Sequence, residues 1–345
     1  MHEPLTPKDY TLSHLRQLQE SWPAVQDADV DGVHQARIVT RRIRAVLPYV
    51  AGAPKGTQKY VRRIGRALGR VRELDVTDES LTTFERRVAR APLAIGLLRE
   101  HIHHELDRER RRMIKALDRP PRAITNDITH IGFARITSIW RDWRHELMTG
   151  VARRAEDVDA AVRRATTVYM PNRSHAARIA LKKLRYMAEF AAAAGLLRDR
   201  SVLDDIKKAQ EALGELNDLH VVAKLIERFK MPAEAAEEAK MLASVVDAEI
   251  ARVHEKYLRQ RDRLYSVCSA CRRLGSDSGA HVARMVARAI PAAGLIALPL
   301  AVSYFGRSEV RELTGAGSPH ETRTARRRPA ARSSRPAFRP ARVSD

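Results

Sequence analysis

Two segments of the chain place His, Arg and Lys side chains on one face of a helix. Positions three and four residues apart fall within about 80° of one another on a helix, so such residues form stripes more than two turns long. The first stripe consists of His34, Arg37, Arg41 and Arg44, with Arg42 at its edge; the second consists of His175, Arg178, Lys182 and Arg185, with Lys183 at its edge. Apolar residues occupy the opposite face of both segments, which predicts one buried side and one cationic side.

No acidic residue lies among the members of the first stripe. Solvated helix faces usually alternate in charge, and like charges one turn apart cost roughly 0.2–0.5 kcal/mol per pair. Because this cost recurs in both segments, an external anion is favoured over an ordinary solvated face. His34 and His175 have no carboxylate in helical reach, which favours hydrogen bonding to phosphate over metal binding.

The two stripes belong to a longer internal repeat. Residues 33–50 align with 174–191, and residues 64–76 align with 209–221, in the same order and at separations of 141 and 145 residues. One such match can arise by chance between basic helices. Two matches in register indicate a duplication.

The helix that follows the first stripe is expected to add further cations. Its basic residues, which we predict to share one face, are Lys59, Arg62, Arg63, Arg66 and Arg70. The matching helix keeps Lys207 and Lys208 but has Glu211 and Glu215 at the positions of two of these Arg residues. The first half of the repeat is therefore the more basic one.

A second motif, Leu-Gly followed by polar residues, also occurs twice. We expect its glycines, Gly69 and Gly214, to permit close helix crossing. The polar members are Glu73, Asp75, Asn217 and Asp218. They either orient neighbouring guanidinium groups from a second layer or make local turn and helix-end hydrogen bonds, and the sequence leaves both interpretations open.

The fold class follows from the hydrophobic spacing. Apolar residues recur at helical intervals from residue 5 to about 275, and no stretch alternates as a strand would. Thr6-Pro7 predicts a helix start with Pro in the first turn. The expected helices cover 8–21, 30–51, 56–72, 76–91, 93–118, 126–149, 154–168, 173–196, 201–229 and 233–273. The chain is therefore predicted to be all-α.

The overall charge points to anionic partners. The 345 residues include 63 Lys and Arg against 42 Asp and Glu, which gives a net charge of +21. The N-terminal ten residues contain no apolar stretch typical of a secretory leader, so we expect a cytoplasmic protein. Cys268 and Cys271, the two cysteines, are expected to be thiols on a late helix, with redox or zinc use disfavoured. A surface metal site at His101 and His104 is disfavoured as well.

The last 70 residues differ in composition from the rest. They hold 12 Arg and 5 acidic residues, and residues 322–345 are rich in Arg, Pro, Ser and Ala. Such a segment cannot bury enough apolar surface to order itself, so residues 276–345 are predicted to form a disordered basic tail. Within them, the apolar residues 289–305 contain Pro and Gly, which favours docking or interfacial contact over membrane insertion. A chain ending near Arg273 is expected to stay folded.

The paired motifs resemble those of the CHAD family, the conserved-histidine α-helical domain. The resemblance rests on His-x-x-Arg-x-x-x-Arg-Arg-x-Arg at 34–44, His-x-x-Arg-x-x-x-Lys-Lys-x-Arg-Tyr at 175–186, and the Leu-Gly motifs at 68–76 and 213–218. It implies two four-helix bundles related by a pseudo-two-fold axis around a basic central cavity. The bundles would cover residues 1–120 and 121–275. It also implies binding of inorganic polyphosphate and recruitment to polyphosphate granules.

The leading hypothesis is therefore a polyphosphate-binding module without catalysis, cofactor or metal. Some relatives carry an enzyme domain with a Glu-x-Glu-x-Lys motif, and this sequence has no such motif. The alternative is an architectural nucleic-acid-binding protein that uses the same basic surface and tail. Stacking on bases would require aromatic side chains in the basic faces. Tyr186 is nearly the only one there, which favours a bare phosphate chain.

Overall fold

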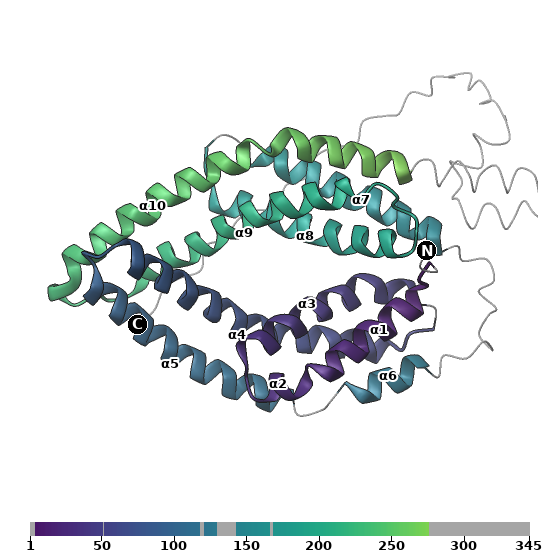
Figure 1. The fold of residues 1–345 in the computed structure, drawn as a ribbon, viewed down its shortest axis with the longest axis horizontal. Coiled ribbons are helices and arrows are strands. Elements are labelled where there is room, and N and C mark those ends of the chain that lie inside the picture. The colour runs from purple at the N-terminus through teal and green to yellow at the C-terminus, as the bar shows by residue number, and fades with distance from the viewer. Residues whose placement is uncertain (1–3, 51, 118–120, 130–142, 166–167, 276–345) are drawn as a thin grey trace, which may run out of the picture. The chain divides into compact units, whose positions relative to one another are not determined.

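The computed structural model describes residues 4–50, 52–117, 121–129, 143–165 and 168–275 (Figure 1). Residues Met1–Val282 form one compact unit, and a second unit spans Ala283–Asp345. The second unit lies outside the described residues. The predictions made for the tail and for the apolar stretch 289–305 fall there as well.

All regular structure in the described residues is helical, so the all-α prediction is confirmed (Figure 1). The α-helices are α1 Pro7–Glu20, α2 Trp22–Gln26, α3 Val30–Val46, α4 Lys55–Arg87, α5 Pro92–Ala116, α6 Arg122–Thr129, α7 Trp143–Arg164, α8 Pro171–Ala193, α9 Ser201–Arg228 and α10 Ala236–Leu258. Short 3₁₀ turns occupy Leu47–Tyr49 and Ala233–Ala235, and residues 261–275 form a further helical stretch. Within the described part, no helix is long and apolar enough to cross a membrane.

Side-chain caps fix the starts of two helices. The Thr6 hydroxyl accepts a hydrogen bond from the Asp9 amide at 3.2 Å at the start of α1, as Thr6-Pro7 predicts. The Asp29 carboxylate accepts from the Gly32 amide at 2.7 Å at the start of α3. A Cβ at Gly32 would lie 2.5 Å from the Ala24 Cβ, so this glycine allows α2 and α3 to approach closely.

Several of the predicted helix boundaries are wrong, and α2 is not among the predicted helices. α4 is continuous where a break between residues 72 and 76 was expected, because the intervening residues include no helix breaker and Asp75 is buried in the contact with α5. α7 runs through Gly150, where the sequence predicted a break. The expected helix 233–273 is interrupted by a turn at residues 259–260.

The helices pack as two series joined side by side. α1, α3, α4 and α5 contact in that order, and α7, α8, α9 and α10 do the same. The main contacts between the two series are those of α3 with α8, α4 with α9, and α5 with α10. The helices matched by the duplication, α3 with α8 and α4 with α9, are therefore neighbours. The pseudo-two-fold axis itself stays a prediction.

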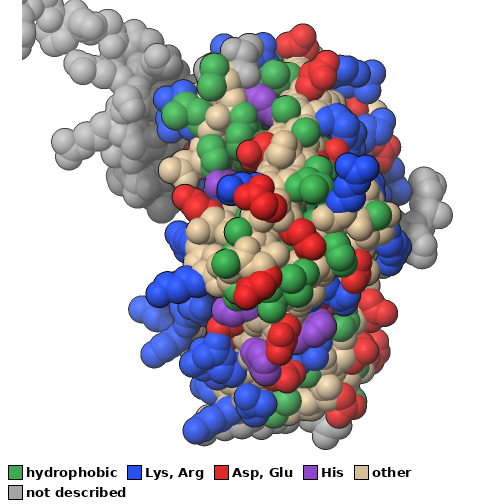
Figure 2. Space-filling model, turned by 90° about the vertical axis from the view of Figure 1, so that its left-hand side faces the viewer, with side chains coloured by type: hydrophobic (Ala, Val, Ile, Leu, Met, Phe, Trp, Pro, Cys, Tyr) green, Lys and Arg blue, Asp and Glu red, His purple; other side chains and the backbone are tan. Residues whose placement is uncertain are grey.

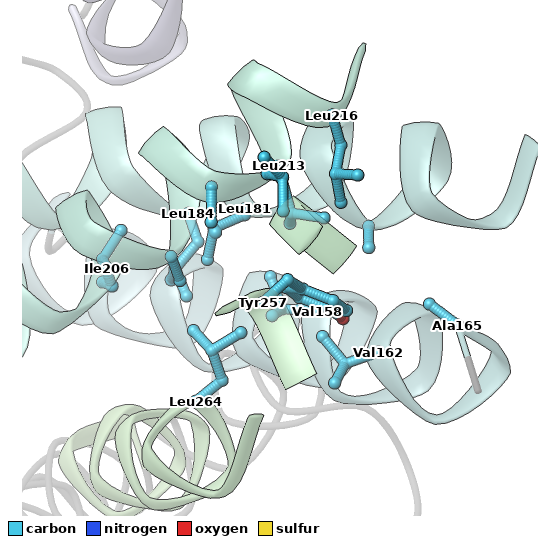
Figure 3. Packing of buried hydrophobic residues seen from close by; sticks show 14 of the residues in the cluster. Val158, Val162, Ala165, Leu181, Leu184, Ile206, Leu213, Leu216, Tyr257 and Leu264 are labelled. Atoms are coloured by element: carbon cyan, nitrogen blue, oxygen red, sulfur yellow. The ribbon is translucent and has the colours of Figure 1, made fainter. Parts of the chain in front are cut away.

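Two main apolar clusters hold the helices in place. One lies among α1 to α5 and includes Leu15, Ile43 and Leu68, which are fully buried. The larger one is centred on α7 to α10, where Leu181, Leu213 and Tyr257 interdigitate (Figure 3). It extends into the C-terminal end of α4 and the N-terminal half of α5, so this cluster includes residues of both halves.

Both cysteines lie in the larger cluster. Cys268 and Cys271 are free thiols and are buried. Burial, together with the neighbouring Cys271, raises the pKa of the Cys268 thiol to about 12, and burial raises that of Cys271 to about 11. They act as small apolar core residues, in agreement with the interpretation of two thiols on a late helix.

Candidate functional site

The contact between α3 and α8 brings the two predicted stripes together. Arg37 and Arg41 on α3 lie close enough to Arg178 and Lys182 on α8 to repel them, and we call these four residues the central cation cluster. All four side chains are partly buried. The sequence predicted each stripe separately, and the structure places them face to face.

Burial and mutual repulsion perturb the charges of this cluster. Burial, then the charges of Arg41 and Arg178, lowers the pKa of Arg37 to about 10. Burial, then the charges of Arg41, Arg178 and Arg37, lowers the pKa of Lys182 to about 6. A shift of this kind means that the charged form is poorly compensated in the free protein. A bound anion would supply the missing compensation.

Few polar groups compensate the cluster from within the protein. Arg37 donates from Nη1 to the Gly69 carbonyl at 2.7 Å. The buried Nε of Arg178 has no hydrogen-bond partner among the described residues. The charges of Glu73 and Asp218 favour the charged form of Arg178, which places both carboxylates beside the cluster. The four cations thus outnumber these two acids.

The polar residues of the Leu-Gly motifs separate into two environments. Asn217 faces His175, with the ring Nδ1 and the amide Oδ1 2.8 Å apart, and its Nδ2 donates to Asp218 at 3.2 Å. Asp75 is buried on the other side of α4 and pairs with Arg110 of α5 at 3.3 Å. Asn217 and Asp218 therefore support the cationic face, whereas Asp75 holds α4 against α5.

Two predicted ligand residues are engaged in a structural ion pair. Arg42 and Arg185 share the carboxylate of Glu189, at 3.0 Å and 2.7 Å. Arg42 contributes from α3, so the triad ties the two halves together. Tyr186 is buried, 7% exposed, with the Arg185 guanidinium 6.0 Å from its ring centre. These residues support the α3–α8 contact, and the Tyr186 ring is not open to solvent.

The cations of α4 have different surroundings. Burial, then the charges of Arg62, Arg41 and Arg66, lowers the pKa of Arg44, so Arg62 and Arg66 extend the central cluster along α4. Arg63 instead donates to the Ala116 carbonyl at the end of α5, at 2.5 Å. Lys59 is exposed nearer the start of the helix. Arg62 and Arg63 are adjacent and therefore lie about 100° apart on the helix, which lets one face α3 and the other reach the end of α5.

The remaining predicted residues differ in exposure. Lys183, Lys207 and Lys208 are exposed. His34 is partly buried, and burial followed by the charge of Arg72 lowers its pKa. The structure therefore separates the predicted anion-binding residues into a central cluster, an extension along α4 and a set of solvent-exposed cations.

The glycines do not serve close helix crossing at the predicted positions. A Cβ at Gly214 would meet nothing within 4 Å, and one at Gly69 would reach the Arg37 guanidinium at 3.9 Å, an ordinary contact. Gly65 fills that role instead, since its added Cβ would lie 3.2 Å from the Thr40 methyl. At Gly69, the carbonyl that accepts from Arg37 is the functional feature.

Sequence reasoning missed a second set of residues beside the cluster. A cavity of about 850 Å³ lies between α4 and α5 on one side and α9 and the start of α8 on the other. Its lining includes Arg70 and His175 from the predicted set, together with His220, Lys224 and Arg228. Lys224 and Arg228 are one turn apart, which could have been detected by extending the stripe search along this helix.

The arrangement of charge is uneven over the molecule. Figure 2 shows one end of the described unit, where Lys and Arg gather along one edge of the lower half and acidic and apolar side chains intermix over most of the remaining area. Mixed surfaces of this kind are typical of solvated helices. The central cation cluster differs because its members come from two helices and lack acidic partners of equal number.

The family model of the CHAD domain matches residues 9–227. This chain belongs to the CHAD family. The match includes α3, α4, α8 and all but the last residue of α9, and therefore every residue of the central cation cluster. No curated protein sequence matches the chain.

Two solved structures share the fold. The CHAD domain from the plant Ricinus communis is 23% identical, with a TM-score of 0.54, and the alignment covers 76% of this chain and 93% of that one. PptA from Streptomyces chartreusis is 14% identical, with a TM-score of 0.52, and the alignment covers 74% of this chain and 97% of that one. At these identities the likeness supports the helical architecture alone.

Proposed function

We propose that this chain binds inorganic polyphosphate without hydrolysing it, and that it associates with polyphosphate granules. The observation that supports this most strongly is the convergence of Arg37 and Arg41 with Arg178 and Lys182 from the two halves of the duplication. Membership of the CHAD family agrees with the same ligand. A linear polyanion neutralises cations from both helices at once.

The chemistry of the cluster suits a chain of phosphates without bases. Arg presents a planar fork that binds phosphate oxygens in pairs, and each charge-assisted hydrogen bond contributes roughly 1.5–3 kcal/mol. Tyr186, the aromatic residue nearest the stripes, is buried and makes no stacking platform. Single-stranded nucleic acids require such platforms. The nucleic-acid alternative is therefore less well supported.

A charge-matched pair of variants tests the site. One variant replaces Arg37, Arg41, Arg178 and Lys182 by Ala, and the control replaces four exposed cations elsewhere, Arg86, Arg111, Arg153 and Arg198. We expect the first variant to bind long-chain polyphosphate more than a hundredfold more weakly at physiological salt, about 2.8 kcal/mol. Its affinity should also depend less on salt, because fewer phosphates are neutralised. Equal losses of affinity in both variants would show that binding depends on net charge and not on these four positions.

Absence of turnover needs a separate assay. The chain is incubated with polyphosphate or a nucleoside triphosphate and Mg²⁺ or Mn²⁺, and phosphate release is compared with a boiled sample. We expect no release. Phosphate release that the four-site variant abolishes would contradict the proposal and identify the cluster as catalytic.

A further inference from the structure

The cavity beside the central cation cluster has a lining that a bare phosphate chain does not explain. Its volume of about 850 Å³ lies within the range of small-molecule pockets, roughly 300–1,000 Å³. None of Arg37, Arg41, Arg178 and Lys182 lines it. The cavity is thus distinct from the central cation cluster, although Arg70 and His175 of the predicted anion-binding set line it.

One wall of the cavity is apolar and partly aromatic. Leu74 and Ile102 contribute from the first half, and Val221, Leu225 and Phe229 contribute from the second. The Phe229 ring meets the His101 ring edge to face, with centres 5.4 Å apart. Inorganic polyphosphate has no apolar part to pack against this wall. An occupant with a flat organic body would bury it.

The rim of the cavity is cationic. Arg70, Lys224, Arg228 and Lys230 line it, and all four side chains are exposed. No ion pair is formed by any of them with another residue that the structure describes. Glu105 and Glu109, which also line the cavity, pair with Arg108 and Arg112 on their own helix. The rim therefore offers uncommitted positive charge to a phosphate group.

The duplication shows that the α9 part of this rim, Lys224 and Arg228, is specific to one half. In the register that matches Glu73 to Asp218, Lys224 corresponds to Glu79 and Arg228 corresponds to Thr83. Glu79 is paired with Arg72 at 2.9 Å. A ligand that used both halves equally would not require this difference. The cationic rim therefore indicates an occupant other than the one that the paired stripes serve.

We propose that this cavity binds a nucleoside phosphate. The base packs against the Leu225 and Phe229 wall, and the phosphates lie on Lys224 and Arg228. Asn172 and Glu73, which also line the cavity, are the polar side chains that would meet the base and the sugar hydroxyls. The paired rings of His101 and Phe229 favour a flat base over an alkyl chain at this wall.

Calorimetric titration of the full chain with ATP, inorganic triphosphate and decyl phosphate, each without metal, tests the proposal. We expect ATP to bind at least tenfold more tightly than triphosphate, because only ATP reaches the apolar wall. Equal affinities would overturn the proposal and leave the cavity as an extension of the polyanion site. Tighter binding of decyl phosphate than of ATP would overturn it in favour of a lipid-like amphiphile.

Variants separate this site from the polyphosphate site. Lys224→Glu with Arg228→Thr, which installs the residues of the other half, should weaken ATP binding at least tenfold and change polyphosphate affinity less than threefold. Phe229→Leu, which keeps an apolar side chain and removes the ring, should weaken ATP but not triphosphate. The Ala variant of the central cluster should keep ATP affinity within threefold. If every folded variant loses affinity for ATP and for polyphosphate in parallel, the separate nucleotide site is overturned. The proposed polyphosphate site would stand.

Discussion

Lys182 shows how the free protein tolerates a cluster of like charges. Its amino group is surrounded by three arginines, and burial is the first cause that lowers its pKa to about 6. The free protein therefore holds Lys182 largely neutral at pH 7.5, where an exposed lysine is charged. The arginines cannot respond in the same way, because their pKa values start far higher.

The first prediction concerns the pH dependence of polyphosphate affinity. A bound polyanion favours the charged form and raises the pKa of Lys182, so binding takes up a proton above about pH 6. Affinity should accordingly fall as pH rises from 6 to 8, with up to one proton taken up per complex by this residue. Titrations at several pH values and in buffers of different ionisation enthalpy measure this uptake.

Lys182→Arg provides the discriminating variant. Arg keeps the positive charge but does not titrate in this range, so the pH dependence should flatten while binding persists. Lys207→Arg, on the exposed face of α9, is the matched control and should leave the slope unchanged. A slope unaffected by Lys182→Arg would assign the proton uptake to other groups, such as His34 and His220.

The second prediction concerns the ion triad at Glu189. Its carboxylate is 16% exposed and compensates both Arg42 and Arg185. Glu189→Gln leaves two half-buried guanidinium groups beside an already cationic cluster, so we expect unfolding to become easier by about 2 kcal/mol. Glu237→Gln, which breaks the exposed pair with Lys240, should have no measurable effect. Chemical denaturation of both variants makes the comparison.

The sequence predicted the composition of the site better than the role of each residue. Helical spacing alone places Arg37 and Arg41 on one stripe and Arg178 and Lys182 on another. Spacing within one helix cannot show that Arg42 meets Glu189, since the two are 147 residues apart. It likewise cannot reveal that Asp75 faces α5. Such assignments depend on tertiary contacts that no local pattern encodes.

At the scale of elements, the length of α4 determines how both sites are arranged. Its 33 residues extend from Lys55 to Arg87, so one helix contributes Arg62 and Arg66 to the cluster and Arg70 to the neighbouring cavity. The expected break near residue 74 would have separated these positions from the end of α4 that packs in the larger apolar cluster. Polar residues suggested an end there, but burial of Asp75 with Arg110 favours continuation.

The third prediction uses the glycines of these helices. Gly214 lies inside α9 with open space around its missing Cβ, so Gly214→Ala should stabilise the protein by about 0.5–1 kcal/mol. Gly96→Ala on α5, which also meets open space, should give a similar gain. Gly32→Ala should lower the melting temperature, because its Cβ would collide with Ala24. A destabilising Gly214→Ala would restore the close-crossing interpretation.

At the scale of the whole molecule, the two halves share one framework and differ in charge. Each helix of the stripes contacts its counterpart, and the larger core extends from α7 to α10 into the ends of α4 and α5. Neither half can therefore keep its apolar surface covered alone. The sequence revealed the duplication but not this shared core, because apolar spacing gives the buried face of a helix without its partner.

The last prediction concerns where the folded unit ends. A chain truncated after Val282 retains the helical stretch 261–275, whose Leu264, Val267, Cys268 and Cys271 are buried in the larger core. Gly275 also packs closely, since a Cβ there would lie 2.5 Å from the Ala152 Cβ. We therefore expect a helical spectrum, a cooperative melt and a polyphosphate affinity within tenfold of the full chain, about 1.4 kcal/mol.

A shorter chain, truncated after Leu258, is the matched comparison. It removes the four buried core residues, at roughly 1.5–3 kcal/mol for each large apolar side chain. That loss is comparable to the whole stability of a typical domain, about 5–15 kcal/mol, so this chain should melt without cooperativity or not fold. If the chain that ends at Val282 unfolds as well, residues beyond Val282 belong to the core. If it folds but loses most of its affinity for polyphosphate, the Arg-rich segment is the principal anion site and the central cation cluster is secondary.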